Sequence, residues 1–249
     1  TASGNLLFFV ATDGSTGNEL WKSDGTAAGT VLVADIVAGT GTPAIQNPVN
    51  LNGTLIFTAV LPAGTRKLWK SDGTGAGTVM IKDVVFGNAA GGIPDELIEY
   101  NGKVYFPAND GVNGIELWAT DGTTAGTNLF LNIATSPTYP NSRPHNFAVA
   151  AGKLYFSAFT ASTSYELWVS DGSAPGTYMV LDIVPGGSGG GPAGFTELNG
   201  LVYFSADDRA AAGRELWKTD GTAAGTTMVK DINTGTGDSN PEQLVAVGN

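Results

Sequence analysis

Short runs of hydrophobic residues alternate with polar and glycine-rich turns along the whole chain. Around Trp118 the pattern is clear, with runs at Leu97–Tyr100, Lys103–Ala108, Glu116–Thr120 and Asn128–Ile133. The dipeptide Asn101-Gly102 separates the first two runs. It favours a type I′ hairpin turn, because that turn needs positive φ at both central residues. The alternation therefore predicts four short antiparallel strands in this stretch and no helix.

The same unit recurs five times. Its tryptophans, Trp21, Trp69, Trp118, Trp168 and Trp217, are 48, 49, 50 and 49 residues apart. Repeats of this length are typical of propeller blades, whereas helical solenoids have shorter repeats that carry long amphipathic helices. Each unit is therefore interpreted as one four-stranded blade.

The two ends of the chain predict how the blades form a ring. The N-terminal run Asn5–Ala11 is interpreted as a second strand whose first strand is missing, and the C-terminal run Gln243–Val247 as a first strand without a second. The sequence therefore predicts a single domain over residues 1–249. Its fold would be an all-β five-bladed β-propeller with four antiparallel strands per blade, closed by the C-terminal strand completing the first blade.

Two features of every unit have both a structural and a functional interpretation. The tryptophan could offer a stacking platform for a sugar, but in the middle of a strand it favours packing between blades. The turn that follows, Asp121–Thr127 in the third unit, could hold a metal ion or a phosphate. Its aspartate and glycines also suit a tight turn closed by local hydrogen bonds, and we favour that structural role.

The repeated segments ELWKSDG, KLWKSDG, ELWATDG, ELWVSDG and ELWKTDG, each followed by Thr or Ser, two further residues and a Gly-Thr pair, resemble the bacterial ELWxxDGT-repeat proteins. The resemblance covers all five units and implies an exported bacterial surface or secreted protein of unassigned activity. The second unit departs from the pattern with Lys67 in place of glutamate, and the fourth with Ser173 and Pro175 in the turn. In period and blade number the chain also resembles five-bladed propeller lectins of the tachylectin type, which is a likeness of fold alone.

The composition of the chain limits the classes of molecule that it is expected to bind. A formal net charge of −11 disfavours nucleic acid, since binding a polyanion requires a basic surface. The same charge disfavours an anionic membrane surface, and no apolar run is long enough to span a bilayer. The chain has no cysteine and only 14% charged residues. Together with its first residue, Thr1, this composition indicates a mature or excised segment of an exported protein, located outside the cell or at the bacterial surface.

No set of residues in the sequence predicts catalysis. His145 is the single histidine, and no common hydrolase, metalloprotease or nucleotide-binding motif is present. We therefore expect no enzyme activity, no catalytic residues, no metal ligands and no cofactor. A Ca²⁺ ion in the channel or the acidic loops is the alternative that the oxygen-rich side chains leave open.

The loops between second and third strands, and the crossings between blades, vary from unit to unit, whereas the Asp-Gly-Thr turns do not. Variable loops on a rigid scaffold are where recognition usually lies. The candidate ligand-binding residues are the polar and aromatic residues of these loops: Asp13, Asp110, Tyr139, Arg143, His145, Tyr165, Asp207 and Arg209.

These observations favour a non-catalytic extracellular binding or adhesion module with glycan as the ligand class. The alternative is a structural or protein-interaction module of a bacterial surface assembly, and a hydrolase or lyase is a third hypothesis. The expected partner is a carbohydrate or a surface protein, without nucleic acid or membrane insertion. The oligomeric state is left open.

Overall fold

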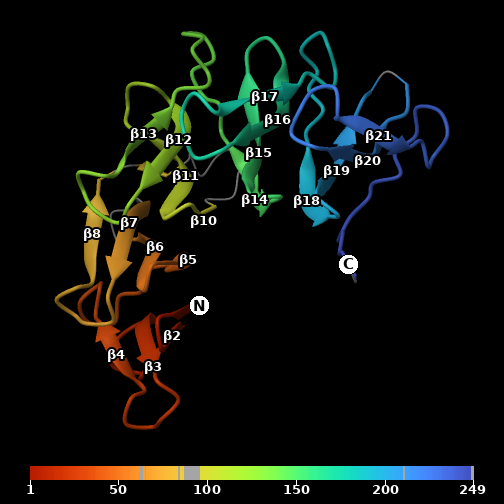
Figure 1. The fold of residues 1–249 in the computed structure, drawn as a ribbon. Helices are drawn as coiled ribbons and strands as arrows, with labels where there is room; N and C mark the ends of the chain where they lie inside the picture. The colour runs from red at the N-terminus through yellow and green to blue at the C-terminus, as the bar shows by residue number, and fades with distance from the viewer. Residues whose placement is uncertain (62–63, 65, 84, 87–95, 210, 248–249) are drawn as a thin grey trace. The chain divides into compact units, whose positions relative to one another are not determined.

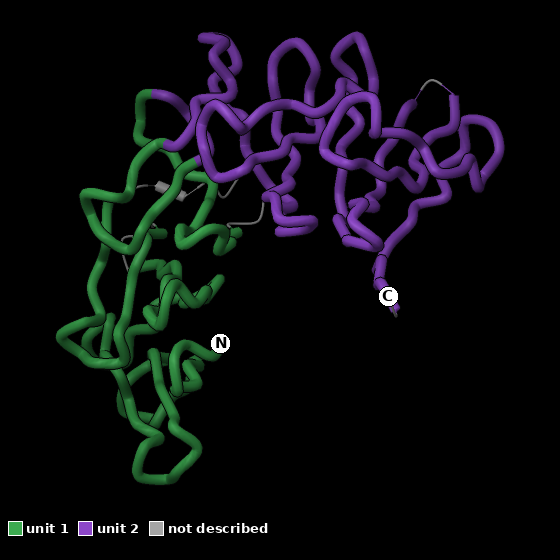
Figure 2. Tube along the Cα trace, viewed as in Figure 1, with its two compact units in different colours: residues 1–112, 118–129 green, residues 113–117, 130–249 purple. Residues whose placement is uncertain are grey.

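Antiparallel strand pairs group the described residues into five sheets, each built on four consecutive strands (Figure 1). The computed structural model describes residues 1–61, 64, 66–83, 85–86, 96–209 and 211–247. Its contacts define two compact units, residues 1–112 with 118–129 and residues 113–117 with 130–249 (Figure 2), and each is described by itself. No helix long and apolar enough to cross a membrane occurs among the residues described.

The strands of each sheet follow one another in the chain. The first sheet contains β1 (Ala2–Ser3), β2 (Leu6–Ala11), β3 (Glu19–Ser23) and β4 (Val31–Ala34), and the second β5 (Gln46–Leu51), β6 (Thr54–Val60), β7 (Arg66–Ser71) and β8 (Val79–Lys82). The third contains β10 (Ile98–Tyr100), β11 (Lys103–Asn109), β12 (Ile115–Thr120) and β13 (Asn128–Leu131), with β9 (Val85–Phe86) also paired to β11. The fourth contains β14 (His145–Ala150), β15 (Lys153–Thr160), β16 (Ser164–Ser170) and β17 (Thr177–Leu181), and the fifth β18 (Ala193–Leu198), β19 (Leu201–Asp207), β20 (Arg214–Thr219) and β21 (Thr227–Lys230).

The strands predicted for the third sheet are confirmed with small differences at their ends. The predicted type I′ turn is also present, since Asn101 and Gly102 have φ angles of 50° and 72°. In every sheet four consecutive strands pair in the order in which they occur in the chain. This order confirms the blade-like unit and the count of five.

The first sheet corrects the prediction for the N-terminus. Ala2 and Ser3 form β1 and pair with Leu7 and Leu6, so the first strand is not missing. The chain turns there through Gly4, whose φ is 59°. Gln243–Val247, predicted to fill this position, lies outside any strand. A two-residue strand leaves almost no alternation to detect, which is why the sequence pattern did not reveal it.

Adjacent sheets within a unit pack through the same kinds of side chain. In the first unit, Leu68 of the second sheet packs with Phe106 and Trp118 of the third. In the second unit, Leu167 of the fourth sheet packs with Phe204 and Trp217 of the fifth. Trp118 and Trp217 are 4% and 8% exposed, which confirms the core role predicted for these two tryptophans.

The Asp-Gly-Thr turns close on themselves, as the structural interpretation predicts. In the third sheet, the Oδ1 atom of Asp121 accepts hydrogen bonds from the backbone N–H and the hydroxyl of Thr123, at 2.8 and 2.7 Å. The Thr123 hydroxyl oxygen in turn accepts the N–H of Gly126 at 2.9 Å. The carboxylate is thereby committed to the turn, and the hydrogen bonds from Thr123 lower the pKa of Asp121.

Candidate functional site

One cavity of the second unit brings together residues from a crossing and from a strand hairpin. The crossing runs from β13 to β14, and the hairpin joins β15 to β16. The cavity has a volume of about 350 Å³ and is lined by Thr138, Tyr139, Pro140, Asn141, Arg143, Phe159 and Tyr165. The β15–β16 loop and the crossing thus meet at the same end of the fourth sheet, where the sequence placed its variable face.

Aromatic rings form the apolar part of this cavity, which we call the aromatic pocket. Phe159 packs edge-on against Tyr139 and Tyr165, with ring centroids 6.4 and 5.5 Å apart. His145 adds a fourth ring, 5.0 Å from Tyr165 at an interplanar angle of 84°. Tyr139 is 58% exposed, so its ring also reaches solvent. The rings of Tyr139 and Tyr165 stand at 60° and 63° to that of Phe159, and together the three rings form the apolar walls of the pocket.

A buried glutamate fixes the crossing that carries the pocket. Glu116 on β12 accepts hydrogen bonds from the N–H and the hydroxyl of Ser142, at 3.0 and 2.6 Å, and from the N–H of Ile133 at 2.7 Å. Burial raises the pKa of Glu116. Because Ser142 lies between two lining residues, Glu116 sets the position of the pocket wall without reaching the pocket.

Further backbone bonds hold the two lining residues beside Ser142. The side-chain oxygen of Asn141 accepts the N–H of Ile115 at 2.8 Å, and the N–H of Arg143 donates to the carbonyl of Ile115 at 3.1 Å. Arg143 has a φ of 44°, a left-handed conformation that is unusual for a residue with a side chain. The surrounding bonds therefore hold Arg143 in a conformation that it would not favour alone.

Arg143 is the one charged side chain among the residues that line the aromatic pocket. Its guanidinium makes no hydrogen bond or ion pair with any residue in the described ranges, although its carbonyl lies 3.0 Å from Nδ1 of His145. An arginine fork recognises a carboxylate through two parallel hydrogen bonds. Arg143 therefore gives the pocket a site for a carboxylate beside its aromatic walls.

The other predicted site residues lie in separate turns. Asp207 accepts the N–H of Arg209 at 2.7 Å and pairs with its guanidinium at 3.5 Å in the loop after β19. In the first unit, Asp13 accepts the backbone N–H groups of Thr16 and Ser15, and these bonds hold its pKa far below the usual value. Asp110, also in the first unit, accepts the N–H of Val112 at 2.9 Å.

Of the eight predicted site residues, Tyr139, Arg143 and Tyr165 thus line one pocket, and His145 packs against it. Phe159 and Asn141 were missed. A signal for Phe159 was present, since the corresponding second strands of the other sheets carry Thr12, Val60, Asn109 and Asp207 at that position. An aromatic residue at a position that is polar or aliphatic in the other repeats is not required by the shared fold.

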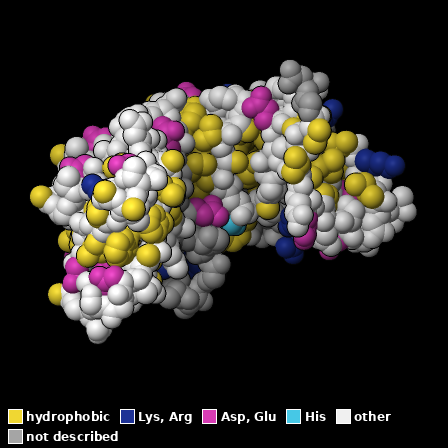
Figure 3. Space-filling view, turned by 90° about the horizontal axis from the view of Figure 1, so that it is seen from below, with side chains coloured by type: hydrophobic (Ala, Val, Ile, Leu, Met, Phe, Trp, Pro, Cys, Tyr) yellow, Lys and Arg dark blue, Asp and Glu magenta, His cyan; other side chains and the backbone are white. Residues whose placement is uncertain are grey.

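The described residues give no sign of a metal centre. Within them, no group of three histidine or acidic side chains is arranged to hold a metal ion. The single histidine reaches the surface of the molecule (Figure 3), and its ring packs edge-on against the ring of Tyr165.

Comparisons with known proteins define the fold. No family model and no curated protein matches the chain. Among solved structures, the chain is similar to prolyl endopeptidase, with 14% identity over 90% of this chain and 32% of that one and a TM-score of 0.53. It is also similar to puromycin hydrolase, with 11% identity over 98% of this chain and 40% of that one and a TM-score of 0.55. TolB from Acinetobacter baumannii has 12% identity, covers 87% and 50%, and gives a TM-score of 0.48.

The fold and these similarities place the chain among all-β propeller proteins. It spans about a third to two fifths of the prolyl endopeptidase and puromycin hydrolase chains. The sequence-based prediction of a glycan-binding adhesion module, with a surface-assembly module as its alternative, is corrected by this result. The similar structures above, prolyl endopeptidase and puromycin hydrolase, are not lectins.

Proposed function

We propose that this chain is a non-catalytic propeller module of a larger hydrolytic protein, and that its aromatic pocket binds peptide segments. The observation that carries the proposal is the arrangement of Arg143 beside Tyr139, Phe159 and Tyr165. The apolar walls suit a proline or aromatic side chain, because aromatic-lined grooves bind extended proline-rich peptides. The guanidinium suits a carboxylate of the same peptide.

The similar structures support a peptide ligand and a larger parent protein. One of them is a prolyl endopeptidase, and another is puromycin hydrolase complexed with PGG. The net charge of −11 adds a second reason, since an overall acidic protein disfavours a carboxylate ligand unless a cation such as Arg143 lies at the binding site. Membership of the ELWxxDGT-repeat proteins and an extracellular or cell-surface location are proposals of the same kind, supported by the repeated signature.

We also propose that the five sheets close into one ring and one domain. Within a compact unit, each sheet buries one face against the next sheet along the chain. The fifth sheet carries the same kinds of residue on the corresponding face, which we call its outward face. On that face, Val229 and Ile232 are 43% and 53% exposed. The opposite face of the first sheet carries Leu7, which is 52% exposed, where the second sheet has the fully buried Leu55. These two faces are complementary in the same way as the faces that are packed.

Peptide binding is tested with one peptide in two forms. Acetyl-Gly-Pro-Phe with a free carboxylate and the same peptide as an amide are titrated by calorimetry, with a neutral oligosaccharide as a third ligand. We expect the acid to bind at least about tenfold more tightly than the amide, because a charge-assisted hydrogen bond contributes about 1.5–3 kcal/mol.

Arg143→Gln should remove that preference and Tyr165→Ala should weaken both forms of the peptide. The matched control is Arg209→Gln. Arg209 also has a positive φ, of 50°, and lies in the same unit, but it does not line the pocket. Equal binding of acid and amide, a matching loss in Arg209→Gln, or binding of the oligosaccharide alone would each overturn the proposed function.

A further inference from the structure

The hairpins that join the first and second strands of the second, third and fifth sheets turn through the same dipeptide: Asn52-Gly53, Asn101-Gly102 and Asn199-Gly200. The φ angles are 51° and 86° in the first pair, 50° and 72° in the second, and 54° and 77° in the third. These values belong to a type I′ turn. All of these residues are exposed. Because sequence, backbone and exposure agree, a difference in reactivity among the three turns must come from their neighbours.

An asparagine followed by glycine can react with its own backbone, because glycine has no side chain to hinder the approach. The glycine nitrogen gives its proton to water and forms a bond with the asparagine Cγ. The bond from Cγ to the amide nitrogen breaks, and this nitrogen takes up a proton through water and leaves as ammonia. Water then opens the cyclic imide at one of its carbonyls, which gives aspartate or isoaspartate. The rate therefore depends on how easily the glycine N–H loses its proton.

In the second and third sheets a side chain holds this N–H. Gly53 donates its N–H to Oδ1 of Asn50 at 2.9 Å, and Gly102 donates its N–H to Oε1 of Glu99 at 2.8 Å. A hydrogen bond to the protonated form of a group opposes the loss of its proton. The carboxylate of Glu99 also places a negative charge beside the nitrogen that would become negative. The turn of the third sheet is therefore the better protected of the two.

The fifth sheet has the acceptor at the same position but uses it elsewhere. Glu197, two residues before Asn199, accepts through Oε2 the N–H of Ala151 at 2.5 Å. Ala151 lies in the corresponding turn of the fourth sheet. Neither the N–H of Gly200 nor the side chain of Asn199 makes a hydrogen bond with any residue that the structure describes. The protecting group is thus committed to the neighbouring sheet, and the Gly200 N–H faces water.

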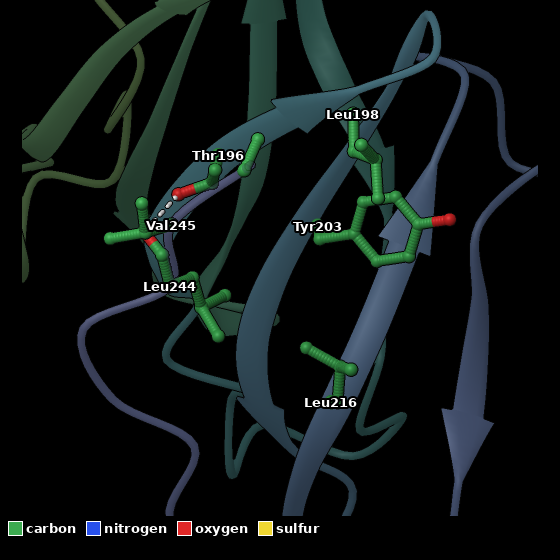
Figure 4. Close-up of a pocket in the computed structure, with 7 residues that line it drawn as sticks. Thr196, Leu198, Tyr203, Leu216, Leu244 and Val245 are labelled. Atoms are coloured by element: carbon green, nitrogen blue, oxygen red, sulfur yellow. Dashed lines mark hydrogen bonds between the residues drawn. The ribbon is translucent and has the colours of Figure 1, made fainter. Parts of the chain in front are cut away.

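The strands on either side of this turn are held by their own contacts. Leu198 and Tyr203 line a cavity of about 250 Å³ together with Leu216 of β20 (Figure 4). The hydroxyl of Thr196 on β18 donates to the carbonyl of Leu244 at 3.0 Å, which is the bond drawn in Figure 4. A reaction at the exposed turn therefore does not require the hairpin to unfold.

A fourth pair, Asn113-Gly114, lies in a different setting, in the loop before β12. The side-chain oxygen of Asn113 accepts the Nδ2–H of Asn132 at 3.2 Å. A Cβ atom at Gly114 would collide with the carbonyl oxygen of Pro140, so the backbone is packed closely there. The rotation that brings the glycine nitrogen to Cγ has little room at this pair.

We propose that Asn199 is a site of spontaneous deamidation and the first Asn-Gly pair of the folded protein to react. The product is aspartate or isoaspartate in the turn between β18 and β19. It adds a negative charge next to Glu197, and isoaspartate also lengthens the main chain of the turn by one methylene. The inference goes beyond the proposed function, since no residue of this turn lines the aromatic pocket.

The test follows deamidation in the folded wild-type chain, kept in mildly alkaline buffer and sampled over time by tryptic peptide mapping. Trypsin places the four Asn-Gly pairs on four separate peptides, Ser23–Arg66, Asp83–Lys103, Val104–Lys153 and Leu154–Arg209. Fragment masses assign each change to its asparagine. We expect Asn199 to react about two- to tenfold faster than Asn52, the factor that corresponds to one hydrogen bond in a protein. Asn101 should be slower than both, because its hydrogen bond is to a carboxylate.

The same measurement in concentrated urea separates structure from sequence. There the four rates should come close together, because glycine follows every one of these asparagines. Reaction of any other pair as fast as Asn199 in the folded protein would overturn the proposal. An equal lead of Asn199 in urea would do the same, because the hydrogen bonds of the folded state would then have no part in it.

Two variants at one position test the cause. Glu197→Asn provides the acceptor that Asn50 provides in the second sheet and should slow Asn199 by about two- to tenfold. Glu197→Ala is the matched control, because it loses the bond to Ala151 equally but offers Gly200 no acceptor, and Asn199 should stay fast. In the third sheet, Glu99→Ala should speed the reaction of Asn101. Equal rates in Glu197→Asn and Glu197→Ala would overturn the assigned role of the acceptor.

Discussion

At the scale of single residues, buried glutamates hold the points where the chain passes from one sheet to the next. Glu19, Glu116, Glu166 and Glu215 are fully buried, and each accepts hydrogen bonds from backbone N–H groups of the following crossing. In the second sheet Lys67 takes this position and pairs with Asp83 instead. The sequence shows the repeated glutamate but not its role, because its partners are backbone groups at a distance of 17 to 26 residues.

Glu116→Gln should destabilise the protein by about 2–3 kcal/mol, since an amide has only one accepting oxygen for the several donors that face the carboxylate. The NH₂ group of the glutamine would also face backbone N–H groups that now donate to the carboxylate, and two donors cannot bond to each other. Because Glu116 fixes Ser142, peptide binding should weaken with stability. Denaturant unfolding measures the loss, and Glu242→Gln, an exposed glutamate, is the control. Equal stability of the two variants would contradict this role.

The environment of Glu166 leads us to predict that the stability of the protein depends on pH. Burial, and then the charge of Asp182, raises its pKa from 4.5 to about 7, and it accepts the N–H groups of Ile183 and Gly190 without the serine hydroxyl found in the third and fifth sheets. A raised carboxyl pKa in the folded state means that its contribution to stability is complete below pH 4.5 and is lost as pH rises through about 7. Wild type should therefore lose more stability between pH 5 and 8 than Glu166→Gln, measured by thermal unfolding at each pH. Parallel profiles would show that Glu166 keeps an ordinary pKa.

At the scale of elements, hydrophobic alternation and turn residues were enough to predict the four consecutive strands of the third sheet, because such strands have one or two faces packed against a neighbouring sheet. They did not reveal β1, and they predicted a strand at Gln243–Val247 that the structure does not have. The third sheet follows the prediction closely, from Ile98–Tyr100 to Asn128–Leu131. The pocket could not be predicted in the same way. Its walls come from a crossing and a hairpin that are joined by bonds such as Ser142 to Phe159, which no local pattern contains.

The Asp-Gly-Thr turn allows a sharp test of an element. A Cβ atom at Gly126 would collide with the carboxylate of Asp121, so Gly126→Ala must break the bonds that close the turn. We expect Gly126→Ala and Asp121→Ala to cost about 1–2 kcal/mol each in unfolding free energy. The double variant should cost clearly less than their sum, because both changes remove the same bonds. Neither change should affect peptide affinity. Full additivity would mean that the two residues act independently.

At the scale of the whole molecule, ties between consecutive sheets repeat with the blades. Lys22 Nζ donates to the carbonyl of Gly73 at 2.7 Å, and Lys70 Nζ donates to the carbonyl of Gly122 at 2.9 Å. In both cases the lysine that follows the tryptophan reaches the Asp-Gly turn of the next sheet. Lys218 holds this position in the fifth sheet, and it makes no hydrogen bond or ion pair with the described part of the chain.

The proposed closed ring would give Lys218 the kind of partner that Lys22 and Lys70 have, and by the repeat that partner would be the carbonyl of Gly25. Lys218→Met should then lower the melting temperature by about as much as Lys22→Met, roughly 2–4 °C for each kcal/mol lost in a chain of this size. In an open chain Lys218 would be an ordinary surface lysine, whose replacement changes stability by less than about 0.5 kcal/mol. Methionine keeps most of the aliphatic stem in both variants, so the comparison isolates the ammonium group. A loss confined to Lys22→Met would show that the fifth sheet has no neighbour on its outward face, and the ring proposal would fall with it.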